Sequence, residues 1–429
     1  MGPQRARRMA AVLLAAAVFV LTYVLIAVRR FRSVDVPRGL AALAGAALML
    51  VLGIVTPAEA LASVDVGVLL LLVGMMMLVA GLEYCGLFSL ISDMLVRRAR
   101  SRRGLLALVM CVSAALSAVA LNDAVVLLFT PVVIRCCRSI GCTPVPYLVG
   151  TMVSANIGSM CTIVGNPQNA YIASMAGIDF VTFSMYLVPV TLVCMPVAFA
   201  VVYAVFRKRL DEPYPADAVC GAASDGRAVD TPRLKAVAAV FLAALALFAA
   251  SGPLGIPIHV VAVCAGAGAL AVIMAASPRN ILWMAGRIDW SVILFFAGLF
   301  VLMAGVTQSG LLEAIACSFP GFRPGETPSL TGVMVFSAVL SNLVSNVPSV
   351  MLIGGMIPAG GTGLWIALAS SAALAGNATI LGSAASIIVC ERSERYGITL
   401  DFFRFLAMGV PLAVLTLLLA AGMLTLMFG

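Results

Sequence analysis

The sequence is short of charge. Of its 429 residues only 10% are Asp, Glu, Lys or Arg, whereas 63% are hydrophobic. The chain runs through many apolar stretches of about 20 residues, the length that crosses a bilayer, so a water-soluble domain is excluded. We therefore expect a multi-pass protein of the plasma (inner) membrane, with the lipid bilayer as a partner.

The net charge of +8 has an explanation within that class. In a soluble protein such an excess favours nucleic-acid binding. Here the basic residues stand at the ends of apolar stretches, where they orient membrane helices. We expect no nucleic-acid partner.

The sequence also lacks the residues of most catalytic and metal sites. It has one histidine, and its 11 cysteines form neither a CxxC pair nor a Cys/His metal pattern. It contains no GxxxxGK[ST] loop that would hold ATP. We expect no enzyme, no resident metal and no cofactor, while Na⁺ as a coupling ion stays open.

One interrupted apolar helix, from Asn156 to Ser174, organises the chain. It contains the pentapeptide GNPQN at 165–169. Proline lacks an amide proton and disfavours helical geometry in the residue before it, and glycine permits unusual dihedrals, so the pentapeptide is predicted to be unwound. Unwound backbone at membrane depth survives only inside protein or beside a watery cavity. Secondary transporters place substrates and coupling ions at such breaks.

Apolar runs bounded by charge or by Pro and Gly predict an all-α polytopic protein with about 10 spanning helices. The first half (1–206) is predicted to contain a re-entrant hairpin at 104–134 and a broken helix at 144–176. A cytoplasmic linker follows at 207–233, and the second half (234–429) has a hairpin at 328–358 and a broken helix at 361–390. The remaining helices are expected at 9–28, 39–56, 65–87, 180–206, 234–250, 256–276, 289–311 and 402–428.

The second half repeats the first. Segments 65–88 and 289–312 align without gaps at an offset of 224, which continues through the two hairpins. An offset of 217 places TIVGNPQN (162–169) opposite TILGSAAS (379–386). Matched glycines and asparagines in register over three segments indicate an internal repeat, with these pairs among its matches: Asp65/Asp289, Gly74/Gly298, Gly81/Gly305, Gly86/Gly310 and Asn122/Asn346.

Loop charge indicates that the two repeats are inverted. If the hairpin at 104–134 enters from the cytoplasm, 22 of the 26 Lys and Arg residues lie in cytoplasmic loops. Five crossings then separate matching points of the halves, and an odd number inverts one half relative to the other. The N-terminus, with Arg5, Arg7 and Arg8, is then expected outside.

Four unwound points are predicted to meet near the midplane: the two hairpin tips and the two helix breaks, the second around 382–386. Half-helix N-termini offer amide protons to anions, whereas C-terminal carbonyls and Asn, Ser or Thr oxygens suit Na⁺. The predicted substrate-binding residues are Asn122, Gly165, Asn166, Pro167, Gln168, Asn169, Ser345, Asn346, Asn377, Thr379, Gly382 and Ser383. Ion coupling is assigned to Asn122, Asp123, Thr162, Gly165, Ser345, Asn346 and Gly382.

Asp123 is the one carboxylate that this reading places deep within an apolar segment. An ionisable residue at that depth is costly and is functional by default, here as a cation ligand or a proton carrier. The alternative is an aspartate that caps the second limb of the hairpin. Asp65 and Asp289, in contrast, precede apolar runs and are expected to be helix N-caps.

The sequence resembles the ion transporter superfamily, which includes arsenite-export permeases, NhaD-type sodium/proton antiporters, the melanosomal P protein, citrate permeases and divalent-anion/sodium symporters. The resemblance covers nearly the whole chain. It implies a homodimer with a scaffold part and a transport part that moves as an elevator. It rests on Asn122-Asp123, NIGSMCTIVGNPQN (156–169), LSNLVSNVPSVML (340–352) and GNATILGSAASIIV (376–389).

The hairpin tips depart from one branch of that superfamily. The dicarboxylate symporters carry Ser-Asn-Thr at both tips, whereas this chain has Leu-Asn-Asp at 121–123 and Ser-Asn-Val at 345–347. This resembles the arsenite and P-protein branch more closely. Three functions stay open: a transporter of a small anionic solute (a carboxylate or inorganic oxyanion) coupled to Na⁺ or H⁺, an arsenite or antimonite efflux permease, and a Na⁺/H⁺ antiporter.

Overall fold

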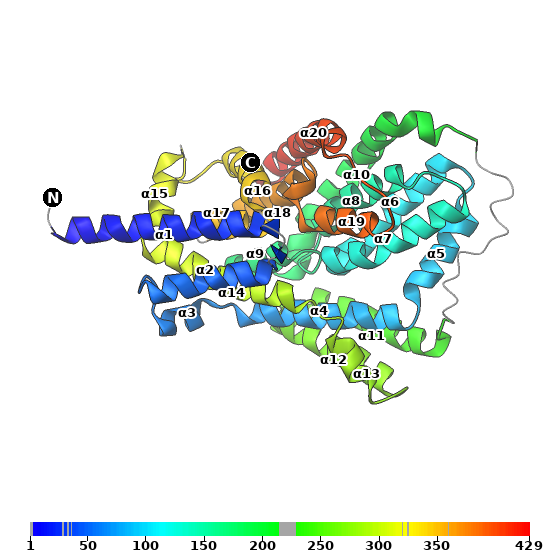
Figure 1. Cartoon of the computed structure of the whole chain (residues 1–429), viewed down its shortest axis with the longest axis horizontal. Helices are drawn as coiled ribbons and strands as arrows, with labels where there is room; N and C mark the ends of the chain where they lie inside the picture. Colours follow the sequence, from blue (N-terminus) through cyan, green and yellow to red (C-terminus); the bar gives the residue numbers. More distant parts are fainter. Residues whose placement is uncertain are drawn as a thin grey trace.

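The computed structural model describes residues 3–27, 30–31, 34–35, 37–213, 229–319, 321–323, 326–358 and 360–429. Within these ranges the regular secondary structure is helical, apart from the two-residue strands β1 (Arg30–Phe31) and β2 (Val34–Asp35), which pair antiparallel. Seven of the described helices are long and apolar enough to cross a membrane, and shorter apolar helices join them. The expected all-α polytopic fold is confirmed (Figure 1).

The helices of the first half end before the linker. They are α1 (Pro3–Ala27), α2 (Arg38–Val51), α3 (Pro57–Ser63), α4 (Val66–Tyr84), α5 (Leu87–Arg98), α6 (Arg102–Val119), α7 (Asn122–Ser139), α8 (Val145–Ser159), α9 (Pro167–Ala176) and α10 (Phe180–Leu210).

The second half begins with α11 (Thr231–Leu254) and α12 (Ile258–Met274). It continues with α13 (Asn280–Ala285), α14 (Trp290–Gln308), α15 (Leu311–Ser318), α16 (Leu330–Val344), α17 (Asn346–Gly354), α18 (Thr362–Ala375), the 3₁₀ turn η2 (Ile380–Gly382), α19 (Ala384–Glu394) and α20 (Phe402–Phe428).

The linker prediction is wrong at both ends. Residues 207–210 complete α10 and residues 231–233 open α11, where Asp230 caps the first turn. Residues 214–228 of the predicted linker lie outside the described residues, so its central part stays a prediction.

Four short helices, α3, α5, α13 and α15, were not predicted. Long apolar runs indicate only membrane-spanning helices, and these four are shorter than such runs. Two of them begin at matched glycines. Gly86 has φ 92° and opens α5, and Gly310 has φ 82° and opens α15. Glycine adopts this left-handed conformation without the strain that a Cβ brings. Each glycine therefore ends a long helix, α4 or α14, and turns the chain into a short one.

Matched glycines also bring the long helices together in crossed pairs. A Cβ on Gly74 of α4 would lie 2.4 Å from the backbone of Ala262 in α12, and one on Gly298 of α14 would lie 2.6 Å from that of Ala42 in α2. A helix of each half thus packs on a helix of the other, with α4 along α12 and α14 along α2. The repeat seen in the sequence has an equivalent packing role in both halves.

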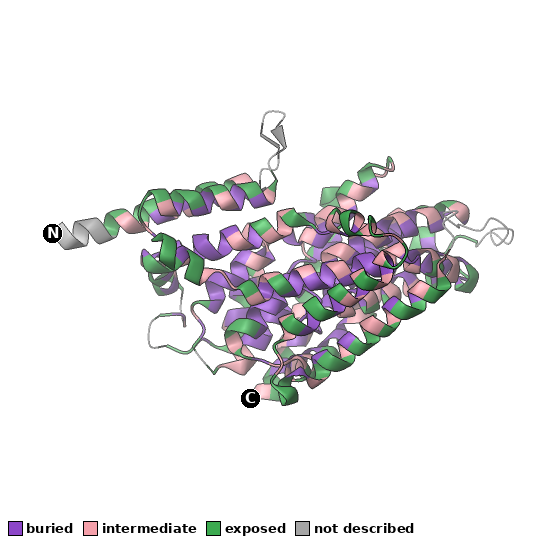
Figure 2. Ribbon diagram, turned by 90° about the horizontal axis from the view of Figure 1, so that it is seen from below, coloured by how far each residue is buried: buried purple, intermediate pink, exposed green. Residues whose placement is uncertain are grey.

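The two hairpins enter from opposite ends of the molecule (Figure 1). The α6–α7 hairpin starts at the end where α5 meets α6, and the α16–α17 hairpin starts at the end that carries α3 and α15. In Figure 2 the buried residues face inward, and the outer faces of the long helices are exposed. Those outer faces carry large apolar side chains such as Leu192 and Leu418, as expected for a surface in contact with lipid.

Candidate functional site

The first helix break lies earlier in the chain than predicted. Helix α8 ends at Ser159 and α9 begins at Pro167, so the unwound segment is 160–166 and the last three residues of GNPQN are helical. Pro167 occupies the first position of α9, where its missing amide proton is no loss and its fixed φ suits a helix. Of the predicted pentapeptide, only Gly165 and Asn166 are outside a helix.

Side chains satisfy the backbone of this break. Asn169 Nδ2 donates to the carbonyl oxygens of Ser159 (3.0 Å) and Thr162 (2.8 Å). The Thr162 hydroxyl accepts from the amide of Gly165 at 3.1 Å and donates to the carbonyl of Ala118 in the first hairpin. Asn169 and Thr162 therefore hold the unwound segment in place, which is what backbone at membrane depth requires.

The first hairpin tip docks on the break of its own repeat. The backbone amide of Asn122 donates to the carbonyl of Gly165 at 2.9 Å. A Cβ on Gly165 would lie 2.3 Å from the carbonyl oxygen of Ser159 and 2.8 Å from that of Ser117, so a side chain has no room there. Gly165 is thus a point of close backbone approach, and its carbonyl faces the tip.

The second break is also earlier than predicted. Helix α18 ends at Ala375 and α19 begins at Ala384, so the prediction of 382–386 overlaps the break only at Gly382 and Ser383. The break contains the turn η2, and the Thr379 hydroxyl donates to Asn342 Oδ1 at 3.1 Å.

The second hairpin tip has unusual backbone geometry. Ser345 has φ 83° and ψ 159°, and it is the one non-glycine residue with positive φ among those described. The Asn346 side-chain amide is assigned the orientation in which its nitrogen faces acceptors. In that orientation the nitrogen donates to the carbonyls of Gly382 (2.9 Å) and Ala372 (3.1 Å). This tip is therefore fastened to the break of the second repeat, as Asn122 is to the break of the first.

Two asparagines that the sequence analysis did not select join these parts. Asn156 of α8 accepts from Asn122 Nδ2 at 3.1 Å and donates to Asn377 Oδ1 at 2.9 Å. Asn342 of α16 donates to the carbonyl of Ala375 at 3.0 Å. Both lie within the motifs that carry the superfamily resemblance. A polar side chain within an apolar helix is the feature by which the sequence could have identified them as functional residues.

A cavity of about 1060 Å³ opens beside the four unwound points. The predicted residues that line it are Asn122, Asp123, Asn166, Pro167, Gln168, Ser345, Asn346 and Ser383. The others, Thr162, Gly165, Asn169, Asn377, Thr379 and Gly382, lie behind this surface in the breaks or beside them. The opposite wall comes from α1, α4 and α14 and is largely apolar, with Tyr23, Met76, Val79 and Phe296 among its residues.

A profile of citrate transporters matches residues 23–373, most of the chain. The chain belongs to the citrate transporter family. An uncharacterized transporter of Mycobacterium tuberculosis (strain ATCC 25618 / H37Rv) is 31% identical, over 95% of this chain and 96% of that protein. The silicon efflux transporter LSI3 of Oryza sativa subsp. japonica is 28% identical, over 86% and 88% of the two chains.

A solved structure shares the fold. The YdaH transporter of Alcanivorax borkumensis superposes with a TM-score of 0.57 at 17% identity, over 98% of this chain and 97% of that one. The resemblance to the ion transporter superfamily is thereby confirmed, and this member of the citrate transporter family is a multi-pass membrane transporter.

Most of the charge in the transporter's cavity is concentrated at one end, which we call its mouth. Arg287 and Glu83 form an ion pair of 3.1 Å there, between the segment that precedes α14 and the end of α4. The other charged lining residues at helix ends are Arg38, Asp289, Glu391, Arg392, Glu394 and Arg395. These residues lie in or beside the segments 29–38, 277–288 and 391–404, which the loop charge predicts to be cytoplasmic, so the mouth faces the predicted cytoplasmic side. Asp123, in the first turn of α7, is the charged lining residue at the hairpin tips.

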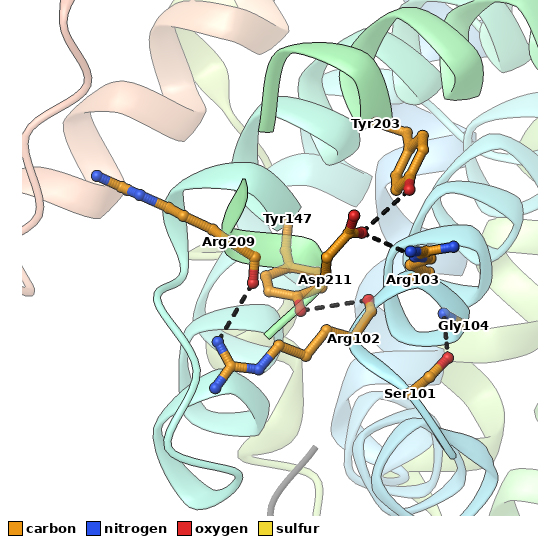
Figure 3. Close-up of polar contacts among 8 residues, drawn as sticks. All are labelled: Ser101, Arg102, Arg103, Gly104, Tyr147, Tyr203, Arg209 and Asp211. Atoms are coloured by element: carbon orange, nitrogen blue, oxygen red, sulfur yellow. Dashed lines mark hydrogen bonds and ion pairs between the residues drawn. The ribbon is translucent and has the colours of Figure 1, made fainter. Parts of the chain in front are cut away.

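The base of the transporter's first hairpin is fastened by polar contacts (Figure 3). Arg103 Nε donates to Asp211 Oδ1 at 2.8 Å, and the Tyr203 hydroxyl donates to the same oxygen at 3.0 Å. The Tyr147 hydroxyl of α8 donates to the carbonyl of Arg102 at 3.3 Å. These bonds hold α6 against α8 and the end of α10, so the hairpin and the first broken helix share one support.

Proposed function

We propose that this transporter is a secondary active carrier of a small oxygen-rich anion, a carboxylate or inorganic oxyanion, and that H⁺ or Na⁺ bound at Asp123 drives it. One observation carries the proposal. Asp123 lines the cavity at the first hairpin tip, in the first turn of α7, while the other charged lining residues among those described stand at the mouth.

Helix termini supply the attraction for an anion. The second limbs of both hairpins and of both broken helices, α7, α9, α17 and α19, begin at the cavity. Each helix N-terminus presents free amide protons and a partial positive charge. The Gln168 Nε2 group adds a buried donor that has no hydrogen-bond partner within the described residues, and Gln168 lines the cavity.

Asp123 supplies the coupling. An ionised Asp123 carboxylate and a solute anion in one cavity repel each other, and the repulsion is strong where water is scarce. A proton or Na⁺ on Asp123 removes that repulsion, so the ion and the anion bind together. Coupled transport requires this mutual dependence.

The remaining parts of the proposal concern movement and assembly. The two hairpins and the two broken helices form the transport part, and α4, α12, α2 and α14 form a scaffold through their crossed packing. The transport part moves past the scaffold as an elevator. The carrier acts as a homodimer, as the superfamily resemblance implies.

A second candidate is the efflux of a neutral hydroxide such as arsenite, antimonite or silicic acid. The lining residues at the tips and breaks include neither Lys nor Arg, so an uncharged polyhydroxyl solute would also be matched by amides and hydroxyls. The rice relative is named a silicon efflux transporter. In the third candidate, the Na⁺/H⁺ antiporter, Asp123 exchanges the two ions with no further solute.

Thermal unfolding of the purified protein in detergent separates these candidates. The panel compares Na⁺ with choline at two pH values, each with citrate, sulfate, phosphate, antimonite or silicic acid. A ligand that binds the folded state raises its stability by about 2.7 kcal/mol at a hundredfold excess over Kd. We expect an anion to stabilise only when Na⁺ or acidic pH is also supplied. Stabilisation by antimonite or silicic acid alone would favour efflux, and stabilisation by Na⁺ alone would favour the antiporter.

The variant Asp123→Asn tests the coupling within the same panel. Because it is permanently neutral, we expect any anion to bind without dependence on Na⁺ or pH, and coupled flux in vesicles to be abolished. Asp401→Asn is the matched control, because Asp401 caps α20 away from the cavity lining. Unchanged ion dependence in Asp123→Asn would refute the coupling role.

A further inference from the structure

Asn156 lies at the one hydrogen-bonded junction described between the first hairpin tip and the second helix break. Its Oδ1 accepts from Asn122 Nδ2 at 3.1 Å. Its Nδ2 donates to Asn377 Oδ1 at 2.9 Å and to Ser383 Oγ at 3.0 Å. One amide thus holds a residue of the first repeat with its oxygen and two residues of the second with its nitrogen.

The junction continues in both directions. The Ser117 hydroxyl in the first hairpin donates to Asn122 Oδ1 at 3.4 Å. The Ser383 hydroxyl donates to Ser386 in the first turn of α19 at 2.9 Å. The resulting chain runs from the first hairpin, beside Asp123, to the start of α19.

Burial makes this junction sensitive to geometry. Asn156 is 2% exposed and Asn377 is 0% exposed. A buried amide that loses its partner pays a desolvation penalty. A shift of the first hairpin tip therefore displaces Asn156 or breaks its bonds, and the second break must follow the displacement or lose a partner.

The repeat provides no second junction of this kind. The offset of 217 that matches the two breaks places Ala373 opposite Asn156, and alanine has no side-chain amide to donate or accept a hydrogen bond. Asn156 joins the first hairpin tip to the second helix break. The matching position in the second repeat, Ala373, cannot join the second hairpin tip to the first helix break in the same way. Asn156 breaks the symmetry of the site.

We infer that Asn156 is a positioning residue that transmits occupancy of the first hairpin tip to the shape of the second helix break. The inference rests on the proposed function, in which the ion binds at Asp123. The inference adds an order of events. The ion binds at the first repeat and thereby positions Ser383 and the N-terminus of α19, which belong to the second repeat and contact the solute.

Hydrogen–deuterium exchange of the purified protein tests this without knowledge of the solute. The probe is the ion alone, Na⁺ against choline at acidic and at alkaline pH. The readout is the change in backbone exchange at two unwound segments, 160–166 and 376–383. In the wild type we expect the ion to change exchange at both segments. In Asn156→Ala we expect the response at 160–166 to persist and the response at 376–383 to be lost.

A double-mutant comparison separates transmission from loss of stability. Asn377→Ala cuts the same link from its far end, so we expect it to lose the same response, with no further loss in the double variant. Ser154→Ala is the matched control. Ser154 is a fully buried polar residue of α8 that bonds only within its own helix, and we expect this variant to keep both responses.

Each contrary result has a definite meaning. If Asn156→Ala keeps the ion response at 376–383, or if Ser154→Ala loses it equally, the positioning role is refuted. If the wild type responds at 160–166 alone, nothing is transmitted and the inference fails while the coupling role of Asp123 stands. If neither segment responds in the wild type, ion coupling at the first tip fails, and the inference fails with it.

Discussion

Ser174 of α9 donates a hydrogen bond of 2.5 Å to the carboxylate of Asp65, the N-cap of α4. The mouth of the cavity is at the other end of α4, beside Glu83. Nineteen helical residues separate these ends, a span of about 28 Å, close to the thickness of the bilayer core. The bond therefore fastens the broken helix α9 to α4, at the end of α4 opposite the mouth.

Ser174→Ala is expected to shift the transporter away from the conformation that is open at the mouth. This exposed hydrogen bond to a carboxylate is expected to contribute about 1 kcal/mol, so the ratio of the two conformations should change roughly fivefold. The measurement is the labelling rate of Leu343→Cys, a cavity-lining position, by an impermeant maleimide from each side of the membrane. The exposed native cysteines are replaced first.

Thr182→Ala is the control for this experiment. Its hydroxyl also donates to an aspartate at 2.5 Å, but both partners belong to the start of α10 and no second element is involved. We expect unchanged labelling in this variant. Equal shifts in Thr182→Ala and Ser174→Ala would show that Ser174 has no specific part in the closure.

Gly74→Ala and Gly298→Ala are expected to destabilise the protein by similar amounts, because the two glycines make equivalent crossings. The added methyl group meets helix backbone at 2.4 Å or 2.6 Å, which a side-chain rotation cannot relieve. Overpacking of this kind costs about 1–3 kcal/mol. Thermal unfolding in detergent measures the effect. Gly422→Ala is the control, since no atom lies within 4 Å of its added Cβ, and we expect no loss.

The features that could be predicted from the sequence are those that a local pattern determines. Long apolar runs identified the membrane class and the spanning helices, and matched glycines identified the repeat. Asp65 and Asp289 were expected to be N-caps, and each side chain accepts at least one hydrogen bond from a backbone amide in the first turn of its helix. All of these depend on residues close together in the chain, or on a pattern that recurs.

The ends of the helix breaks could not be predicted, because contacts between distant residues set them. Proline and glycine indicated that the helix is interrupted near residue 165, but the predicted unwound segment 165–169 placed the start of α9 too late, since α9 begins at Pro167. They did not indicate that α8 ends at Ser159, whose carbonyl oxygen accepts a hydrogen bond from the side chain of Asn169. Asn156 was overlooked for a similar reason. Its partners Asn122 and Asn377 are 34 and 221 residues away, and the repeat offers no match.

Asp179→Ala is expected to lower stability at neutral pH by about 1 kcal/mol, since Asp179 caps α10. The hydroxyl of Thr182 and the nearby backbone amides hold the pKa of the Asp179 carboxyl below its ordinary range. A lowered pKa means that the carboxylate stabilises the folded state above the unfolded pKa of about 3.9, and that this contribution is lost as pH falls through the lower, folded value.

The difference in unfolding temperature between wild type and Asp179→Ala should therefore be constant near neutrality and shrink below about pH 4. Asp179→Asn is the comparison, because its amide oxygen also caps the helix and does not titrate in this range. A wild-type advantage that persists unchanged in acid would contradict a role for the carboxylate.

Ser345→Gly is expected to be more stable than Ser345→Ala, the reverse of their usual order. In an ordinary helix glycine is less stable than alanine by about 1 kcal/mol. Ser345 has φ 83° and ψ 159°, a conformation that costs a residue with a Cβ about 1–3 kcal/mol and costs glycine little. Both variants remove the hydroxyl, so their difference isolates the backbone strain.

Thermal unfolding of the two variants in detergent provides the measurement, with Ser349 as the control position. Ser349 lies one turn further along, inside α17, so Ser349→Gly should be less stable than Ser349→Ala. The same order at both positions would mean that the tip is not strained. If the reversal is found, the hairpin tip that lines the cavity stores strain in the resting protein, and a bound solute or ion that relaxes Ser345 gains affinity from that release.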